Sequence, residues 1–145
     1  RWICEHECPM YGKSWACPPA VGTVTYCKAK CLTHKNALLI STITEVRDIT
    51  NIEETLATRP DHEAVTNQVR DLLRDQGIEP YVLSTESCAE CERRAWLDGK
   101  PCCHPDRMHP CVESHGINIL PLIEELGLTF QYGENVVTWF SLLLY

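Results

Sequence analysis

The chain has 145 residues, a length typical of one domain with a single hydrophobic core. Its 13 Lys and Arg against 20 Asp and Glu give a formal net charge of -7, and no stretch gathers the basic residues into a stripe. Because binding to a phosphate backbone needs such a stripe, we expect no nucleic-acid partner. No apolar run reaches the roughly 20 residues that a membrane-spanning helix needs, so we expect no membrane partner.

Ten cysteines set this composition apart from that of an ordinary cytosolic protein and indicate metal ligation, oxidised pairs or both. They form two groups of five, separated by a long cysteine-free stretch. We therefore expect two irregular, cysteine-rich, metal-binding segments, 1–31 and 86–117, around an ordinary core.

The first cysteine-rich segment contains a loop whose composition suits neither helix nor strand. Cys8 and Cys17 each precede a proline, which fixes the backbone and removes an amide donor, so the chain stays irregular. Gly12 permits a positive φ, and Tyr11 and Trp15 provide apolar cover. This loop is therefore predicted to shield a metal cluster from water.

The cysteine-free middle of the chain predicts two strands. The run 37–46 is β-branched and apolar, which is typical of a central strand. Residues 79–85 predict a second strand that runs directly into Cys88. With the helix between them, these strands complete a β-α-β unit.

The helix of this unit is predicted over residues 58–77. Thr58 and Asp61 have capping-box spacing, and Gly77 provides a stop. The apolar side expected to pack on the sheet consists of Val65, Val69, Leu72 and Leu73. His62, in the first turn, is interpreted as a surface residue, as is His34 in the turn after Cys31.

The second cysteine-rich segment begins with a C-x2-C pair, Cys88 and Cys91, and continues to the adjacent Cys102 and Cys103 and then to Cys111. Trp96 lies within it and is a candidate cover for a metal site or a filler of a gap in the core. A cubane cluster needs four thiolates, and each segment can supply them. The expected sets are Cys4, Cys8, Cys17 and one of Cys27 or Cys31, and Cys88, Cys91, one of Cys102 or Cys103, and Cys111.

The C-terminal part predicts a short helix followed by a hairpin. Asn118 is the expected cap of this helix and Gly127 its stop. Residues 128–130 and 135–145 are expected to form the hairpin, whose long arm completes the sheet. A homodimer that shares a sheet edge through residues 136–145 is one expected partner arrangement.

Together these elements predict an α+β fold. We expect a single domain, 1–145, with a mixed β-sheet covered by about two helices. The two cysteine-rich segments are expected as irregular extensions at one end of the sheet.

Structural zinc is the nearest alternative to an iron-sulfur cluster. Zn²⁺ accepts four cysteines, or three cysteines and one histidine, and four histidines lie beside cysteines: His6, His104, His109 and His115. Zinc sites usually carry two C-x2-C knuckles, and this sequence has one, so the spacing favours iron-sulfur over zinc. Disulfides are less favoured, because they are rare in the reducing cytosol and this chain has its own strands and helices. A radical-SAM site needs C-x3-C-x2-C, and Tyr11 occupies the position of its third cysteine.

Three pieces of the sequence together resemble a family of uncharacterised prokaryotic proteins described as predicted metal-binding proteins. The pieces are WICEHECPMYGKSWACPPAVGTV, ISTITEVRDITNIEETLATR and PCCHPDRMHPCVESHGINI. Their most specific motifs are Y-G-x-x-W-x-C-P-P at 11–19, P-C-x-x-P at 101–105 and E-x-x-G-I at 113–117. The resemblance implies metal binding, with iron-sulfur favoured over zinc, in the cytoplasm of an anaerobic type of cell.

The resemblance also ranks the cysteines. Those that match the family motif are Cys4, Cys8, Cys17, Cys88, Cys91 and Cys102. Cys103 and Cys111 depart from the pattern, because relatives tend to have Arg and Ser there.

The leading hypothesis is an iron-sulfur protein with one or two [4Fe-4S] clusters that acts in electron transfer or as the redox partner of an enzyme. All ten cysteines are candidate cofactor-binding residues, and the expected metal ligands are Cys4, Cys8, Cys17, Cys31, Cys88, Cys91, Cys102 and Cys111. A redox protein is the expected partner. A zinc-stabilised interaction module and an iron-sulfur enzyme with an open iron remain as alternatives.

Overall fold

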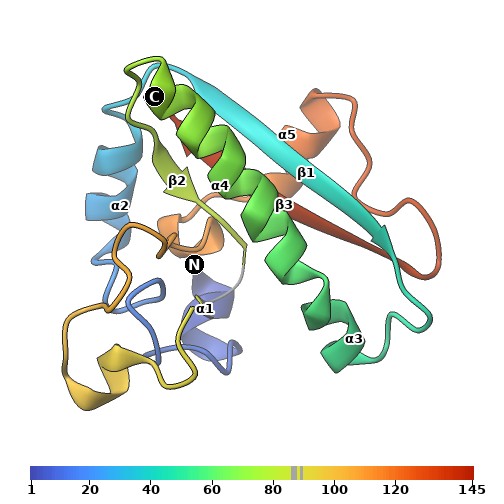
Figure 1. Ribbon diagram of the computed structural model, residues 1–145, viewed down its shortest axis with the longest axis horizontal. Helices are drawn as coiled ribbons and strands as arrows, with labels where there is room; N and C mark the ends of the chain where they lie inside the picture. The colour runs from blue at the N-terminus through green and yellow to red at the C-terminus, as the bar shows by residue number, and fades with distance from the viewer. Residues whose placement is uncertain (86–87, 89) are drawn as a thin grey trace.

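A three-stranded sheet forms the centre of the computed structural model, which describes residues 1–85, 88 and 90–145 (Figure 1). Its strands are β1 (Ala37–Glu45), β2 (Tyr81–Leu83) and β3 (Val136–Leu144), in the order β1-β3-β2. β3 pairs antiparallel with both neighbours. The α+β class and the three main strands are confirmed. The expected mixed sheet is wrong, because β3 lies between the two strands of the β-α-β unit.

The central position of β3 explains its composition. Both faces of a central strand are covered, and all but two of the residues of β3 are buried. β1 pairs along the whole of β3, whereas β2 pairs only with residues 142–144, so the sharing expected through residues 136–145 is not tested. A homodimer itself stays a prediction.

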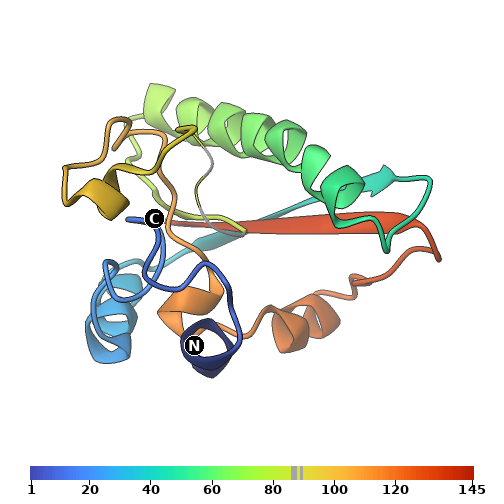
Figure 2. The ribbon, with the colours of Figure 1, turned by 90° about the horizontal axis from the view of Figure 1, so that it is seen from below.

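Helices cover the sheet on both faces (Figure 2). α3 (Ile52–Ala57) and α4 (Arg59–Asp75) lie on one face, where Val69 and Leu73 of α4 pack on a small cluster of buried strand residues. On the other face lie α1 (Trp2–His6), α2 (Val24–Cys31), the 3-10 helix η2 (Glu113–His115) and α5 (Ile119–Glu125). The larger core is on this side and consists of Leu83, Val112, Ile119, Ile123, Phe140, Leu142 and Leu144.

The buried side of α4 differs from the predicted one. Val65 and Leu72 are 36% and 60% exposed, whereas His62, Thr66 and Arg70 are buried. His62, expected at the surface, is fully buried, and its Nδ1 lies 2.9 Å from Thr42 Oγ1. The helix is therefore rotated so that polar side chains share its inner face with Val69 and Leu73, and two of them, His62 and Thr66, hydrogen bond to strand residues.

The predicted cap of this helix is also wrong. Thr58 makes no capping hydrogen bond, and its Oγ1 accepts one from Trp139 Nε1 at 2.7 Å. A separate short helix, α3, precedes α4, and Asn51 caps it by accepting a hydrogen bond from the Glu54 amide at 3.2 Å. The predicted stop at Gly77 is confirmed by its φ of 78°.

The described residues form five α-helices rather than about two. α1 and α2 lie within the segment 1–31, which was expected to be irregular throughout. α5 is confirmed, with Asn118 Oδ1 accepting from the Leu120 amide at 3.2 Å, but residues 128–130 form no strand. Within the described part of the chain, no helix is long and apolar enough to cross a membrane.

Candidate metal centre

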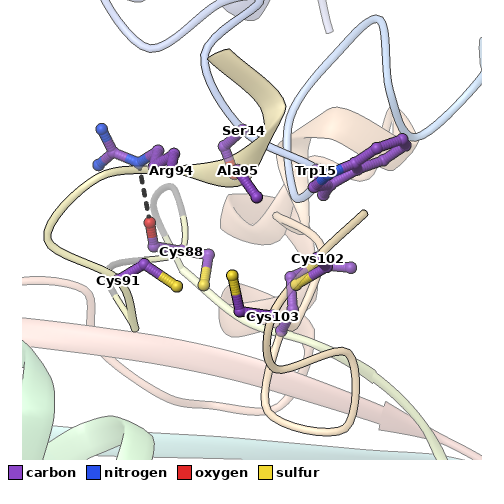
Figure 3. Close-up of a pocket in the computed structure, with 9 residues that line it drawn as sticks. Ser14, Trp15, Cys88, Cys91, Arg94, Ala95, Cys102 and Cys103 are labelled. Carbon is purple, nitrogen blue, oxygen red and sulfur yellow. Dashed lines mark hydrogen bonds between the residues drawn. The ribbon is translucent and has the colours of Figure 1, made fainter. Parts of the chain in front are cut away.

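Eight of the ten cysteines line two separate spaces where the two cysteine-rich segments meet. The first site is an open cavity of about 660 Å³ lined by Cys4, Cys8, Cys17 and Cys111. The second site is a much smaller space, about 20 Å³, lined by Cys88, Cys91, Cys102 and Cys103 (Figure 3). Each site thus has four cysteine sulfurs available.

Three cysteines of the first site come from the N-terminal segment. Cys4 lies on α1, and the chain turns directly after this helix, where the Cys8 amide donates to the Ile3 carbonyl at 3.0 Å. The following loop closes on itself, because the Gly12 amide donates to the Pro18 carbonyl at 2.8 Å. Gly12 has a φ of 66°, which favours glycine. Cys8 and Cys17 are thereby brought to the same cavity.

The fourth cysteine of the first site, Cys111, arrives from the other segment through backbone pairing. Cys111 forms an isolated parallel bridge with Ser84, just beyond β2. Its amide donates to the Ala16 carbonyl at 3.1 Å, so the strand end, the second segment and the Cys17 loop lie side by side. Ser84 and Ala16 are themselves buried. This pairing fixes the Cys111 backbone next to that of Cys17.

The thiols of the first site interact with one another. The hydrogen bond with Cys111 lowers the pKa of Cys4 to about 7. The same hydrogen bond raises the pKa of Cys111, and burial of the Cys111 thiol raises it further. The single proton of the Cys111 thiol has two acceptors within reach, Cys4 and Glu113 Oε2, and the oxygen lies 2.7 Å from Sγ. The site therefore contains a cysteine that ionises near neutral pH, and thiolates are the form that binds metals.

Glu113 lies at the first site, although the sequence pattern does not predict it there. It lines the first cavity, and it follows Cys111 by two residues. The only signal available in the sequence was its position in the E-x-x-G-I motif, which does not indicate contact with a sulfur.

Aromatic contacts join the second site to the N-terminal segment. Trp15 lines this site, and its Nε1 donates to the Lys100 carbonyl at 3.0 Å. Trp96 packs against Trp15 edge to face, with ring centroids 4.6 Å apart, and its Nε1 donates to the Gly12 carbonyl at 2.7 Å. The two indole hydrogen bonds run in opposite directions between the segments, so the segments are tied together at this point.

The sulfurs of the second site point toward a common space. Figure 3 shows those of Cys88, Cys91 and Cys103 turned toward each other, with Cys102 beside them. Partial desolvation and a hydrogen bond with Cys103 raise the pKa of Cys91, and burial raises that of Cys88.

Two residues serve the opposite site from the one expected. Cys111 was assigned to the second set, but it lines the first cavity together with Cys4, Cys8 and Cys17. Trp15 was expected to cover the first site, but it lines the second. Tyr11 does line the first cavity, as expected.

Cys27 and Cys31 line neither space. They lie one turn apart on α2, and burial raises the pKa of both thiols. The Cys27 thiol donates to the Val21 carbonyl at 3.3 Å. The structure therefore does not bring Cys31, the expected ligand, to the other cysteines of its set.

The four histidines considered for zinc line neither space. His115 is buried, and its Nε2 lies 2.6 Å from the Tyr81 hydroxyl. His109 contacts Asn67 Oδ1 through Nε2 at 2.8 Å. His6 stacks on Trp2 at the surface, and His104 is exposed.

None of the ten cysteines forms a disulfide. Among the described residues, no three Cys, His, Asp or Glu side chains lie close enough together to hold one metal ion as they stand. Metal binding at either site therefore requires loss of thiol protons and rotation of side chains.

Comparison with known proteins decides the family. The family model described as "Predicted metal-binding protein (DUF2284)" matches residues 1–145. The chain belongs to this family. No curated protein and no solved structure matches the chain. Membership in DUF2284 confirms the resemblance expected from the sequence and identifies a predicted metal-binding protein.

The donor atoms of both sites fit the metals expected of such a protein. Cysteine thiolates are soft ligands, which select zinc, copper(I) and iron-sulfur clusters over magnesium or calcium. Each site supplies four of them, the number that holds a [4Fe-4S] cluster or a tetrahedral zinc ion.

Proposed function

We propose that this DUF2284 protein is an iron-sulfur protein that transfers single electrons to and from a redox partner protein. In this proposal a [4Fe-4S] cluster is held by Cys4, Cys8, Cys17 and Cys111. The observation that carries the proposal is the open cavity of about 660 Å³ with these four sulfurs in its lining.

The size and lining of the cavity support a cluster rather than a single ion. In a tetrahedral zinc site each sulfur lies about 2.3 Å from the ion, so little space remains between the four sulfurs. The cavity here is large, and aliphatic and aromatic side chains such as Ile117, Ile119 and Phe130 line much of the remainder. An apolar lining suits a cluster, because low polarity and limited solvent access tune its reduction potential.

The residues of the chain have distinct parts in this proposal. The lowered pKa of Cys4 favours the thiolate form, which is the form that binds a metal. Glu113 accepts the hydrogen bond of the protonated Cys111 thiol, and Cys111 gives up this proton when it becomes a ligand. When bound, the cluster supplies the one-electron redox couple.

The position of the cavity supports exchange of electrons with another protein. Trp2, Ile3 and Phe130 line it and are 60%, 62% and 53% exposed. A cluster held there would lie close to the molecular surface.

Anaerobic purification followed by iron, sulfide and zinc analysis tests the proposal. We expect four iron and four sulfide per chain from a single cluster, with a visible absorbance that dithionite bleaches. A colourless protein with stoichiometric zinc and no sulfide would overturn the proposal.

A further inference from the structure

The segment that carries the second site has almost no hydrophobic core of its own. Between Thr85 and Met108, none of the described residues is buried. Its regular structure, within the described part, is one 3-10 turn, η1 (Ala95–Asp98). Loops of this length are uncommon in compact domains, and small units without sufficient core are often held by a metal ion.

Polar contacts alone hold the segment weakly. The Arg107–Glu90 ion pair, at 3.1 Å, and the Arg93–Asp98 pair, at 2.6 Å, both involve an arginine that is more than half exposed. Exposed ion pairs contribute about 0–1 kcal/mol each. The two indole hydrogen bonds of Trp15 and Trp96 are also at partly exposed positions. The buried Arg70 of α4 adds one tie, because its Nη1 donates to the Asp106 carbonyl at 3.0 Å. The part of the segment around the cysteines has only the weaker contacts.

The four cysteines of the second site line one space and would provide a stronger tie after rotation of their side chains. Two of them stand before η1 and two after it, so one bound ion would close the whole loop. The space between them is about 20 Å³, close to the volume of one small ion or water, for which about 10–15 Å³ is the minimum. It is far smaller than the first cavity.

The remaining lining of the second site is compatible with a structural metal site. Besides the cysteines it contains Trp15, Ala95 and Met108, and the described residues that line it include no carboxylate or histidine. Arg94 also lines it and donates from Nε to the Cys88 carbonyl at 3.1 Å. Its positive charge would partly offset the negative charge of four thiolates around a divalent ion.

We propose that Cys88, Cys91, Cys102 and Cys103 bind a single tetrahedral Zn²⁺ ion that holds the segment 85–108 against the Trp15 loop. The role of this ion is structural, since four cysteine ligands leave no open position. The proposal uses none of the cysteines of the first site and stands independently of the iron-sulfur cluster.

Cobalt and zinc binding test the proposal on the wild-type protein. We expect one Zn²⁺ per chain besides the iron. After removal of zinc with a chelator, added Co²⁺ should give the tetrahedral d–d bands and the intense thiolate charge-transfer absorbance of a four-cysteine site. Zinc should abolish these bands in a one-to-one titration. Absence of zinc from the purified protein together with absence of the tetrahedral cobalt spectrum would overturn the proposal.

Substitutions then identify the ligands. Cys103→Ala should lose the zinc and expose 85–108 to limited proteolysis, while Cys27→Ala, a change at a cysteine outside both sites, should keep the zinc and the protection. Cys111→Ala should lose iron and sulfide but keep zinc, which separates this proposal from the iron-sulfur proposal. The zinc proposal would be contradicted if Cys103→Ala kept its zinc and an unchanged cobalt spectrum. It would also be contradicted by eight iron and eight sulfide per wild-type chain, the content of two four-iron clusters.

Discussion

Cys111 is the residue through which the second cysteine-rich segment reaches the first site. Its backbone is held by Ala16 and Ser84, and its side chain lies in the first cavity beside Cys4. Because alanine has no ligand atom, Cys111→Ala should leave a cluster with three thiolates. We expect loss of most iron and sulfide from the protein after anaerobic purification, measured per chain by chemical analysis.

The matched control for this substitution is Cys27→Ala. Cys27 is also a buried cysteine, but its thiol donates to the Val21 carbonyl and lines neither site. The Cys27→Ala variant should retain the iron and sulfide of the wild type. If Cys27→Ala lost the cluster and Cys111→Ala kept it, the ligand set expected from the sequence would be restored.

His62 should make the stability of the protein depend on pH. Burial lowers its pKa from 6.5 to about 4. Below pH 6.5 the unfolded chain binds a proton at this histidine that the folded chain does not, so the free energy of unfolding should fall as the pH drops from about 6.5 to about 4. At pH 5 the loss from this group is about 2 kcal/mol relative to pH 8.

Comparison with His62→Gln isolates this contribution. Urea unfolding followed by tryptophan fluorescence at pH 8 and pH 5 gives the pH-dependent loss of each protein, and acid effects on the metal sites are common to both. The wild type should lose more stability than the variant between these two pH values. Equal losses would show that His62 is not buried in its neutral form.

The sequence pattern indicates which cysteines are candidate ligands, but it does not indicate which of them share a site. Spacing along the chain assigned Cys111 to the nearest cysteines, whereas backbone pairing of Cys111 with Ala16 and Ser84 brings it to the first cavity. The contact depends on β2 and the Cys17 loop lying side by side. No local spacing rule contains that information.

Among the elements, α4 packs on the sheet through hydroxyl groups as well as apolar side chains. Thr66 Oγ1 and Ser141 Oγ lie 2.7 Å apart, and both residues are fully buried. Removing one hydroxyl leaves the other without its partner, at a cost of about 1–3 kcal/mol. We therefore expect Thr66→Val and Ser141→Ala each to lower the free energy of unfolding by this order.

The double variant distinguishes a hydrogen bond from simple packing. With both hydroxyls removed, no donor is left unpaired, so the double variant should be more stable than the sum of the two single losses indicates. Chemical denaturation of the four proteins gives the coupling free energy. Strictly additive losses would mean that the two side chains contribute independently.

Some helices and strands could be predicted from local sequence patterns, and others could not. The run 37–46 and the Asn118 cap predicted β1 and α5 well, because local composition determines both. The prediction of the inner face of α4 was partly wrong. The pattern of apolar residues carries no information about buried polar pairs such as Thr66 and Ser141. The antiparallel order was missed because β3 comes from the far end of the chain.

The whole molecule divides into a sheet with its own core and two cysteine-rich segments gathered at the end of the sheet where β2 lies (Figures 1 and 2). β1 and β3 pair along nine residues each, and apolar clusters cover both faces of the sheet. The buried members of these clusters include no cysteine. The sheet and α4 therefore have sources of stability that are separate from the metal sites.

This division predicts that metal removal loosens the protein locally rather than unfolding it. After chelation and oxidative release of iron, hydrogen exchange measured by mass spectrometry should accelerate in residues 1–31 and 85–111, where few apolar side chains are buried. Amides of β1, β3 and α4 should keep their protection. Restoring iron, sulfide and zinc should return the two segments to the exchange rates of the untreated protein, which controls for chemical damage. Simultaneous loss of protection in β3 and in the segments would instead show that the metal sites stabilise the entire fold.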